Sequence, residues 1–309
     1  MKILYAGSPE PSAKVLEHLL TKTSHSIIGV LTQPDKRRKR GNIKVESAVS
    51  KTASKHSLEI LKPVQIDDSF KNTILGMEFD VLLVSAYGKI LPCWLLNHPK
   101  LMAVNIHYSL LPFYRGASPI QSAILNGDKQ TGITFMKMSE RMDEGDMIEQ
   151  YKININNEWR KDDLENKLCD LTISKIGKIL DSIEKSKYLL VKQNAEEASY
   201  CHKIKKEDGV IDFNNTSSNI FNRFKALNEW PGVSFLHNNL VIKIHNMAIQ
   251  ECNADVIPGK IIRFDKDGIA FKTIDSSIVI THLQFPNKNI ISSNDAFNAY
   301  KDFFKKINF

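Results

Sequence analysis

Cysteine is scarce in this chain of 309 residues, and its four cysteines lie far apart: Cys93, Cys169, Cys201 and Cys252. They form no Cys-x-x-Cys pair and no Cys/His cluster, so the sequence lacks both the ligand spacing of a zinc site and a disulfide framework. We therefore expect reduced, structural thiols, a cytoplasmic location and no bound metal.

Long apolar runs are absent as well. No stretch of the sequence reaches the length of a membrane-spanning helix. The first residues, Lys2 to Ala6, predict a strand rather than a signal peptide, which would need a longer apolar region and a small-residue cleavage site.

Glycine is sparse where a dinucleotide would require it. The strand predicted at Ile3 to Ala6 is followed by the single glycine Gly7, and no Gly-x-Gly-x-x-Gly fingerprint is present. Without these glycines the backbone cannot approach a pyrophosphate closely, so we reject a nicotinamide-dependent oxidoreductase.

The overall composition is that of an ordinary globular protein, with 42% hydrophobic and 25% charged residues. The net charge of +7 favours a polyanionic partner. Charge alone does not choose among a nucleic acid, a phosphorylated metabolite, a membrane surface and simple solubility.

The N-terminal part of the chain has the pattern of a doubly wound α/β fold. A strand at 3–6, a helix marked by apolar residues between 13 and 20, and a strand at 26–31 form a βαβ opening. Three further strands are predicted at 80–85, 103–107 and 131–138, and a helix at 163–183. The apolar run at 80–85 suits the centre of a mostly parallel sheet.

A second domain is expected because the chain is long for one. Periodicity is lost near residue 188, and we predict domain 1 at 1–188, a linker at 189–206 and domain 2 at 207–309. Domain 2 combines a short helix at 219–227 with strands at 240–245, 259–264, 269–273 and 277–283, which suggests a small β-barrel. Trp230 is assigned to its core.

The most informative residues lie at and after the strand at 103–107. Asn105 and His107 share one face of that strand because side chains alternate, so an amide and an imidazole can both address one developing oxyanion. Asp143 lies in a Gly-containing turn that can return to orient the imidazole. These are the parts needed for acyl transfer without a covalent enzyme intermediate. A Ser109 nucleophile is the weaker interpretation.

The ordered string Asn105-x-His107, Ser109-Leu110-Leu111-Pro112, Arg115-Gly116 and Asp143-x-Gly145 resembles the folate-dependent formyltransferases. Within them, the whole chain is most similar to the methionyl-tRNA formyltransferases. The resemblance implies an OB-like barrel for domain 2, and transfer of a formyl group from 10-formyltetrahydrofolate to the amino group of methionine on the initiator methionyl-tRNA. It also implies that Asn105 and His107 stabilise the oxyanion while Asp143 orients His107. We expect a monomer.

The same resemblance implies a folate site and an RNA surface. The folate is expected against a set of loop residues: Ser109, Leu110, Leu111, Pro112, Lys89, Ile90, Leu91, Arg141 and Met142. The tRNA is expected against two basic clusters: Lys36, Arg37, Arg38, Lys39 and Arg40, and Lys203, Lys205 and Lys206. Phosphate contacts by such cations position RNA without reading its sequence.

Two alternatives remain open. A formyltransferase acting on a nucleotide-linked amino sugar would share Asn105, His107 and Asp143 but would not need the basic run 36–40, which otherwise reads as a solvated loop. A non-catalytic RNA-binding protein on the same scaffold would not need the three catalytic residues. Tyr108, Phe113 and Glu144 depart from the family pattern, which usually has a small residue, a basic residue, and a Thr or Ala at these positions.

Overall fold

The computed structural model describes residues 1–37 and 44–305. It divides the chain into two compact units. Unit 1 comprises Met1–Pro119, Gln130–Ile155 and Asp162–Cys201, and unit 2 comprises Ile120–Lys129, Asn156–Lys161 and His202–Phe309. The segment predicted as a linker, 189–206, thus begins inside unit 1 by this division.

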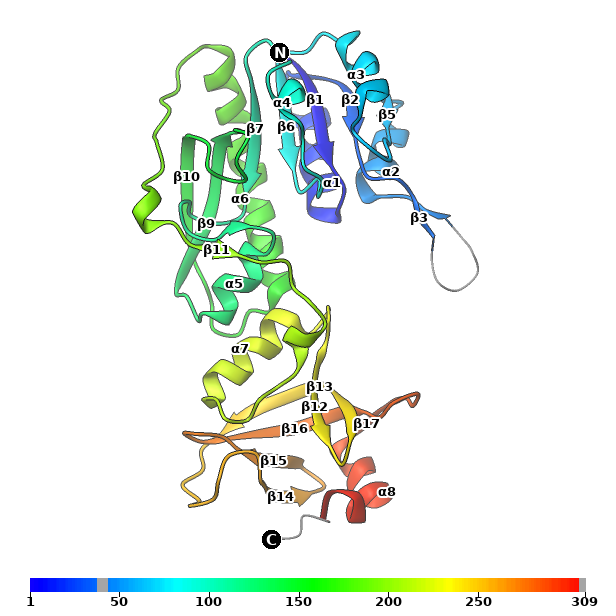
Figure 1. Cartoon of the computed structure of the whole chain (residues 1–309), viewed down its shortest axis with the longest axis vertical. Helices are drawn as coiled ribbons and strands as arrows, with labels where there is room; N and C mark the ends of the chain where they lie inside the picture. Colours follow the sequence, from blue (N-terminus) through cyan, green and yellow to red (C-terminus); the bar gives the residue numbers. More distant parts are fainter. Residues whose placement is uncertain (38–43, 306–309) are drawn as a thin grey trace. The chain divides into compact units, whose positions relative to one another are not determined.

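Unit 1 is built on a seven-stranded, mostly parallel sheet, whose labelled strands appear in Figure 1. Its strands, in spatial order, are β10 (Met147–Asn154), β9 (Gln130–Lys137), β7 (Met102–His107), β6 (Val81–Ser85), β1 (Lys2–Gly7), β2 (Ser26–Leu31) and β5 (Ile60–Leu61). Strands β7, β6, β1, β2 and β5 run parallel to one another, and β9 runs antiparallel to both of its neighbours, β7 and β10. The predicted α/β class is confirmed.

The central strands form because both of their faces are covered. Every residue of β6 is buried, and in β1 the alternating side chains of Leu4 and Tyr5 are fully buried on opposite faces. Leu4 packs in a cluster with residues of α3 (Asp68–Leu75) and α4 (Cys93–Leu96). The hydroxyl of Tyr5 donates to the carbonyl of Ser12 in α1 (Glu10–Lys22) over 2.7 Å.

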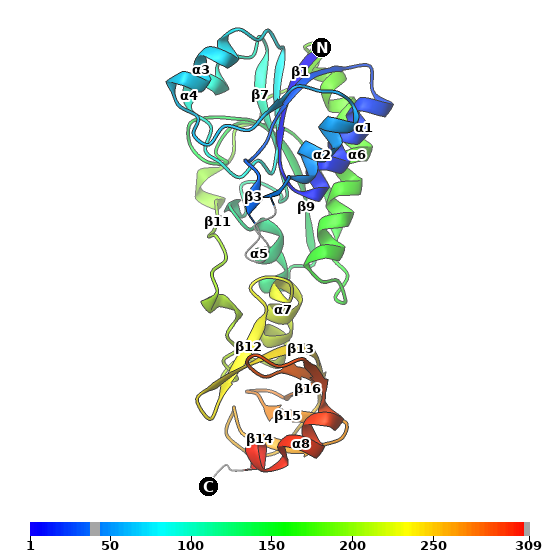
Figure 2. The ribbon, with the colours of Figure 1, turned by 90° about the vertical axis from the view of Figure 1, so that its right-hand side faces the viewer.

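Helices therefore lie on both faces of the sheet, as Figure 2 shows for α1, α2 (Ala48–Lys55) and α6 (Lys161–Glu184) on one side and α3 and α4 on the other. The long helix α6 buries a stripe that includes Leu164, Leu168, Ile176 and Leu180. Within the described ranges, none of the helices is both long enough and apolar enough to cross a membrane.

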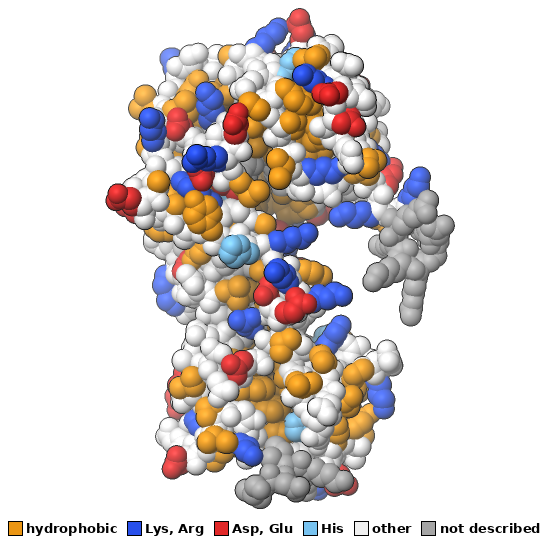
Figure 3. All heavy atoms as spheres, viewed as in Figure 1, with side chains coloured by type: hydrophobic (Ala, Val, Ile, Leu, Met, Phe, Trp, Pro, Cys, Tyr) orange, Lys and Arg blue, Asp and Glu red, His pale blue; other side chains and the backbone are white. Residues whose placement is uncertain are grey.

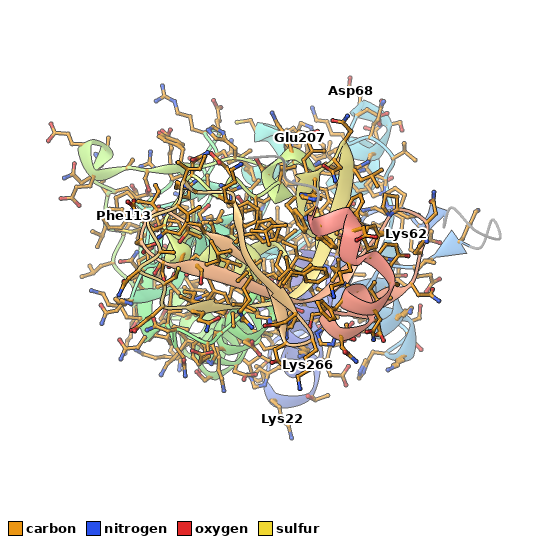
Figure 4. All side chains as sticks on the ribbon, turned by 90° about the horizontal axis from the view of Figure 1, so that it is seen from below. Lys22, Lys62, Asp68, Phe113, Glu207 and Lys266 are labelled. Carbon is orange, nitrogen blue, oxygen red and sulfur yellow. The ribbon has the colours of Figure 1, made fainter. Side chains whose placement is uncertain are left out.

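A short two-stranded ribbon extends after β2. Strand β3 (Lys36–Arg37) pairs antiparallel with β4 (Lys44–Val45). The Nζ atom of Lys62, labelled beside the ribbon in Figure 4, lies 2.7 Å from Asp35 Oδ1 and 3.6 Å from Glu46 Oε1, so one ammonium group holds both ends of the ribbon's base. The predicted RNA-binding residues Arg38, Lys39 and Arg40 lie outside the described residues.

Unit 2 contains an antiparallel sheet and α-helices. The sheet consists of β12 (Val233–His237), β13 (Leu240–Gln250), β16 (Ser277–Gln284), β15 (Gly268–Lys272) and β14 (Ile261–Asp265), with β17 (Ile290–Ser292) paired to β16. Its described α-helices are α5 (Pro119–Leu125), of which all but Pro119 is assigned to this unit, α7 (Ser217–Leu227) and α8 (Ser293–Lys305). Phe213 stacks on Phe271 at 4.4 Å between ring centroids, and Phe235 meets Phe271 edge-on at 5.0 Å.

The prediction of a β-rich second domain is confirmed, and each of its four predicted strands is present. Strand β12 is paired with β13, and β14 with β15; Ser234 of β12 also forms an isolated parallel bridge with Val210. The assignment of Trp230 to the core is wrong, because this side chain is 53% exposed.

Candidate functional site

The site is built at the end of β7, where the sheet changes from parallel to antiparallel. Asn105 lies opposite Val84 of the parallel strand β6 and Met136 of the antiparallel strand β9. His107 ends the strand and is only 5% exposed. Strand alternation places these two polar side chains on one face, with Ile106 on the other. The C-terminal end of such a strand is where open α/β sheets bind ligands.

The turn between β9 and β10 brings a carboxylate to this strand end. Asp143 has a φ of +56°, a left-handed conformation that is uncommon for residues other than glycine and is tolerated best among them by asparagine and aspartate. Gly145 is required in the same turn, because a Cβ at this position would lie 1.8 Å from the carbonyl oxygen of Lys137. The turn is thus pressed against the end of β9.

The three residues expected to be catalytic meet at this point. The Nδ2 atom of Asn105 donates to Asp143 Oδ1 over 3.3 Å. The Nδ1 atom of His107 lies 3.7 Å from Asp143 Oδ2, an ion-pair distance rather than a hydrogen bond. An asparagine amide has a second N–H, so Asn105 can contact Asp143 and still offer a donor to another oxygen.

A three-residue segment, Tyr114–Gly116, contacts both His107 and Asp143. The Nε2 atom of His107 lies 2.9 Å from the carbonyl oxygen of Tyr114, and the backbone N–H of Gly116 donates to Asp143 Oδ2 over 2.9 Å. Because a carbonyl only accepts, Nε2 must carry the hydrogen of this bond. The Nδ1 atom can therefore donate toward the site only when His107 is an imidazolium ion.

Two residues that the sequence analysis did not assign to the site, Arg115 and Gln193, also contact the turn. Arg115 is 3% exposed, and its NH1 atom lies 3.5 Å from Glu144 Oε1. Gln193 contacts the backbone on both sides of Glu144. For Arg115 the Arg-Gly pair was a signal, whereas Gln193 lies in a polar stretch without periodicity and gave none.

The loop 109–112 is tied to the sheet by hydrogen bonds. The buried hydroxyl of Ser109 donates to the carbonyl of Phe113 over 2.6 Å, and the backbone N–H of Leu111 donates to Thr134 Oγ1 over 3.1 Å. The Gln150 amide donates to the carbonyl of Leu111 over 2.8 Å. Since the recorded partner of the Ser109 hydroxyl is a carbonyl and not His107, this geometry does not favour a serine nucleophile.

The other residues expected at the folate lie on two further loops. Lys89 donates through Nζ to the carbonyls of Pro63 and Val64 over 2.7 and 2.8 Å, so its side chain is used within the protein. Leu91 is buried, whereas the apolar side chains of Ile90 and Met142 are 80% and 60% exposed. Leu110 is half-buried, Pro112 is buried and Arg141 is exposed.

The residues that depart from the family pattern occupy distinct environments. The hydroxyl of Tyr108 is buried, and burial raises the pKa of this phenol, which therefore stays neutral. Phe113, labelled at the edge of the molecule in Figure 4, is 48% exposed. Glu144 pairs with the buried Arg115, and also lies 3.6 Å from the NH1 atom of the exposed Arg141.

The expected RNA-binding cations are at the surface where the structure describes them. Lys36 is exposed in β3, and Lys203, Lys205 and Lys206 are exposed at the start of unit 2. Figure 3 shows Lys and Arg side chains interspersed with acidic and hydrophobic ones on the face in view. The described cations of both clusters whose side chains are placed are therefore accessible to solvent.

One group of side chains has the spacing of metal ligands, away from the site. Ligand atoms of His25, Asp181 and Glu184 lie within 4.8 Å of one another. The N-terminal ammonium of Met1 donates to Glu184 Oε1 over 2.8 Å and lies 3.5 Å from His25 Nδ1. This ammonium supplies a positive charge to the group, and the expectation of a protein without a metal stays a prediction.

Comparison with known proteins identifies related chains. Residues 1–177 match the family model described as formyl transferase, and residues 203–301 match that of the formyl transferase C-terminal domain. The sequence is 38% identical over 304 residues to the methionyl-tRNA formyltransferase of Sulfurihydrogenibium sp., covering 97% of each chain. It is 34% identical over 300 residues to that of Thermotoga maritima, covering 97% of this chain and 95% of the relative.

Solved structures share the fold at lower identity. An N-formyltransferase from Helicobacter canadensis, in complex with folinic acid and dTDP-3-aminofucose, superposes with a TM-score of 0.68 at 20% identity, covering 93% of this chain and 100% of the other. HypX from Aquifex aeolicus in complex with tetrahydrofolic acid gives a TM-score of 0.63 at 16% identity, covering 99% of this chain and 48% of the other. At such identities the likeness establishes the fold alone.

The first prediction concerns Gly116, which has a φ of +117° and whose added Cβ would lie 2.3 Å from the carbonyl oxygen of Cys201. Gly116→Ala should displace the N–H that holds Asp143, and we expect turnover to fall at least about tenfold because a shift of about 1 Å at a catalytic group can cost ~10² in rate. Steady-state kinetics and thermal unfolding would measure the effect.

The matched control is Gly177→Ala in α6, where the added Cβ would meet nothing closer than 4.0 Å. A helical Gly→Ala change there should raise stability by about 0.5–1 kcal/mol and leave turnover unchanged. Wild-type turnover in Gly116→Ala would show that this N–H need not stay in place.

Proposed function

The chain belongs to the methionyl-tRNA formyltransferase family, and on that premise we propose that it transfers a formyl group from 10-formyltetrahydrofolate to the α-amino group of methionine on initiator methionyl-tRNA. The observation that carries the proposal is similarity along 97% of the chain to enzymes of this name, together with an amide, an imidazole and a carboxylate gathered at one strand end. In this proposal the amine attacks the formyl carbon, a tetrahedral oxyanion forms, and the bond from that carbon to the folate nitrogen breaks.

In the proposed mechanism, Asn105 and His107 stabilise the oxyanion. Asn105 donates its second Nδ2 hydrogen, the first being used on Asp143. His107 donates from Nδ1 as an imidazolium, because its Nε2 hydrogen is used on the Tyr114 carbonyl. Donors that are already in place when charge develops contribute most to such a step.

Asp143 is proposed to balance the charge of His107 and to accept a proton from the attacking amine. Its carboxylate is 13% exposed and is held by the N–H of Gly116 and the amide of Asn105. The proton lost by the amine passes to Asp143, which then gives it to the departing folate nitrogen, so that the carboxylate is regenerated. Binding the amine in the correct direction supplies much of the rate gain.

The folate is proposed to lie against the loops that contain 89–91, 109–112 and 141–142. Exposed apolar side chains on two of these loops, Ile90 and Met142, suit a flat aromatic ring. The loop 109–112 is fixed by hydrogen bonds to β9 and β10, so its backbone can present a constant edge to the pterin. The donor is then oriented by main-chain groups as well as side chains.

The RNA is proposed to contact the basic run 36–40 and the cluster of Lys203, Lys205 and Lys206. Four of these residues have described side chains, and all four are exposed: Lys36, Lys203, Lys205 and Lys206. Lys62 pairs with Asp35 and with Glu46, which flank the paired strands β3 and β4, and this supports a fixed position for Lys36, the first residue of the run. The amino-sugar alternative has no use for these cations.

The decisive assay is transfer of labelled formyl from 10-formyltetrahydrofolate to methionyl-tRNA by the purified protein, with a dTDP-linked amino sugar as the competing acceptor. Formylation of the tRNA and not of the sugar is expected. The opposite preference would establish the amino-sugar enzyme, and no transfer to either acceptor would favour the non-catalytic RNA-binding protein.

The second prediction tests the catalytic residues. Asn105→Ala and His107→Ala should each lower turnover at least about 10²-fold, because each removes one oxyanion donor, while the fold is retained. Asp143→Asn should reduce turnover comparably by removing the charge beside His107. Single-turnover formylation and circular dichroism measure the two effects.

His56→Ala is the matched control, since His56 also pairs with a carboxylate, that of Glu17 at 3.0 Å, but lies away from the site. Its turnover should equal that of the wild type. A near-normal rate for Asn105→Ala or His107→Ala would remove that residue from the mechanism.

The third prediction tests the basic run. Replacing Lys36 to Arg40 with neutral residues should lower kcat/KM for methionyl-tRNA at least about tenfold and flatten its salt dependence, since counterion release from contacted phosphates is lost. Folate binding and stability should be nearly unchanged, because exposed charges contribute only about 0–1 kcal/mol each to folding.

Arg40→Ala should account for most of this loss, and Arg40→Lys should restore only part of it, since lysine lacks the bidentate guanidinium. Neutralising the exposed Lys51 and Lys55 on α2 is the control for general charge and should have little effect. Unchanged tRNA kinetics after loss of all five cations would make the run a solvated loop and would favour the amino-sugar acceptor.

A further inference from the structure

The side chain of Gln193 grips the backbone of the turn that carries Asp143. Its Nε2 atom donates to the carbonyl oxygen of Asp143 and to that of Gly145, each over 2.8 Å. Both amide hydrogens are therefore used on the two carbonyls that flank Glu144. The preceding residues are anchored too, because Val191 and Met147 exchange backbone hydrogen bonds of 2.8 and 2.9 Å.

Arg115 fixes the orientation of this glutamine. The Nε atom of Arg115 donates to Gln193 Oε1 over 3.0 Å, and a guanidinium can only donate, so the oxygen of the amide must face it. The NH1 nitrogen of the buried Arg115 lies 3.5 Å from Glu144 Oε1 and donates to the hydroxyl of Tyr200 over 3.2 Å. Arg115 therefore orients the Gln193 amide, and contacts with Glu144 and Tyr200 keep Arg115 itself in place.

The hydrogen bonds from Gln193 reach the main chain at and beside a residue with an uncommon backbone conformation. Asp143 is in the left-handed region at a φ of +56°, which is uncommon for residues other than glycine and is best tolerated among them by asparagine and aspartate. The other recorded hydrogen bonds to Asp143, from Gly116 and Asn105, reach its carboxylate and not its backbone. Gln193 therefore fixes the main chain from which that carboxylate projects.

We propose that Gln193 is a positioning residue for Asp143, which places the Asp143 carboxylate opposite His107 for the formyl transfer without touching substrate. The inference rests on the proposed function, in which Asp143 acts on the attacking amine. Loss of the two donated hydrogen bonds leaves the carboxylate free to shift, and a shift of about 1 Å at a reacting group can cost ~10² in rate.

The test is a double-mutant cycle between Gln193→Ala and Asp143→Asn in the full chain. Gln193→Ala should lower kcat for formylation of methionyl-tRNA about 10- to 100-fold while KM for the tRNA and for 10-formyltetrahydrofolate changes less than about twofold. In the Asp143→Asn background the same change should have no further effect, because the group being positioned has already lost its function.

Gln193→Glu keeps the size of the side chain and its acceptor for Arg115 but removes both donors, so it should show the same loss of kcat even where Gln193→Ala fails to fold. The control is Gln284→Ala in unit 2, whose amide likewise donates to a backbone carbonyl, that of Lys288 at 2.7 Å, and faces a ring nitrogen of His245 at 3.1 Å. It should keep wild-type kcat.

Each other outcome overturns the inference in a distinguishable way. Wild-type kcat in Gln193→Glu, with Asp143→Asn slow, would remove the positioning role and leave the proposed function intact. Equal further losses of rate in both backgrounds would show that Gln193 acts on something other than Asp143. Wild-type kcat in Asp143→Asn would end the catalytic role of Asp143 and the inference with it.

Discussion

The contacts of the segment Tyr114–Gly116 with His107 and Asp143 are the constraint on which the rest of the site depends. One carbonyl of this segment takes the Nε2 hydrogen of the imidazole, and one N–H of the same segment meets the carboxylate. The imidazole is thereby left with a single nitrogen facing the carboxylate. Main-chain atoms therefore set the orientation of this pair. Substitution of a side chain does not remove these atoms, although a substitution of Gly116 would displace its N–H.

A buried arginine at the centre of the segment explains one departure from the family pattern. Arg115 is 3% exposed, and a buried charge without a partner would destabilise the fold by several kcal/mol. Glu144, at a position where the family usually has a small residue, supplies a carboxylate 3.5 Å away, and the Tyr200 hydroxyl completes the set. In this chain the Glu144 carboxylate therefore offsets the buried positive charge of Arg115.

The central strands of the fold could be predicted from the sequence, whereas the edge strand β10 and the exposure of Trp230 could not. Strands such as Val81–Ser85 are continuous apolar runs because both of their faces are covered, and that pattern is visible without coordinates. Strand β10 was missed because most of its residues are half-buried at a sheet edge, where apolar and polar side chains are equally tolerated. The exposure of Trp230 was misjudged, since large aromatic side chains lie in cores and at surfaces alike.

The sequence by itself determined that Asn105 and His107 share one face of a strand, since the two-residue period of a strand leaves no other arrangement, and the order of motifs pointed to Asp143 as their partner. Only the tertiary structure decided which nitrogen of His107 faces Asp143, and that Gln193, fifty residues along the chain, grips the Asp143 turn. The physical reason is that these contacts are made to backbone carbonyls and N–H groups. Such groups are the same at almost every residue and leave no trace in the sequence.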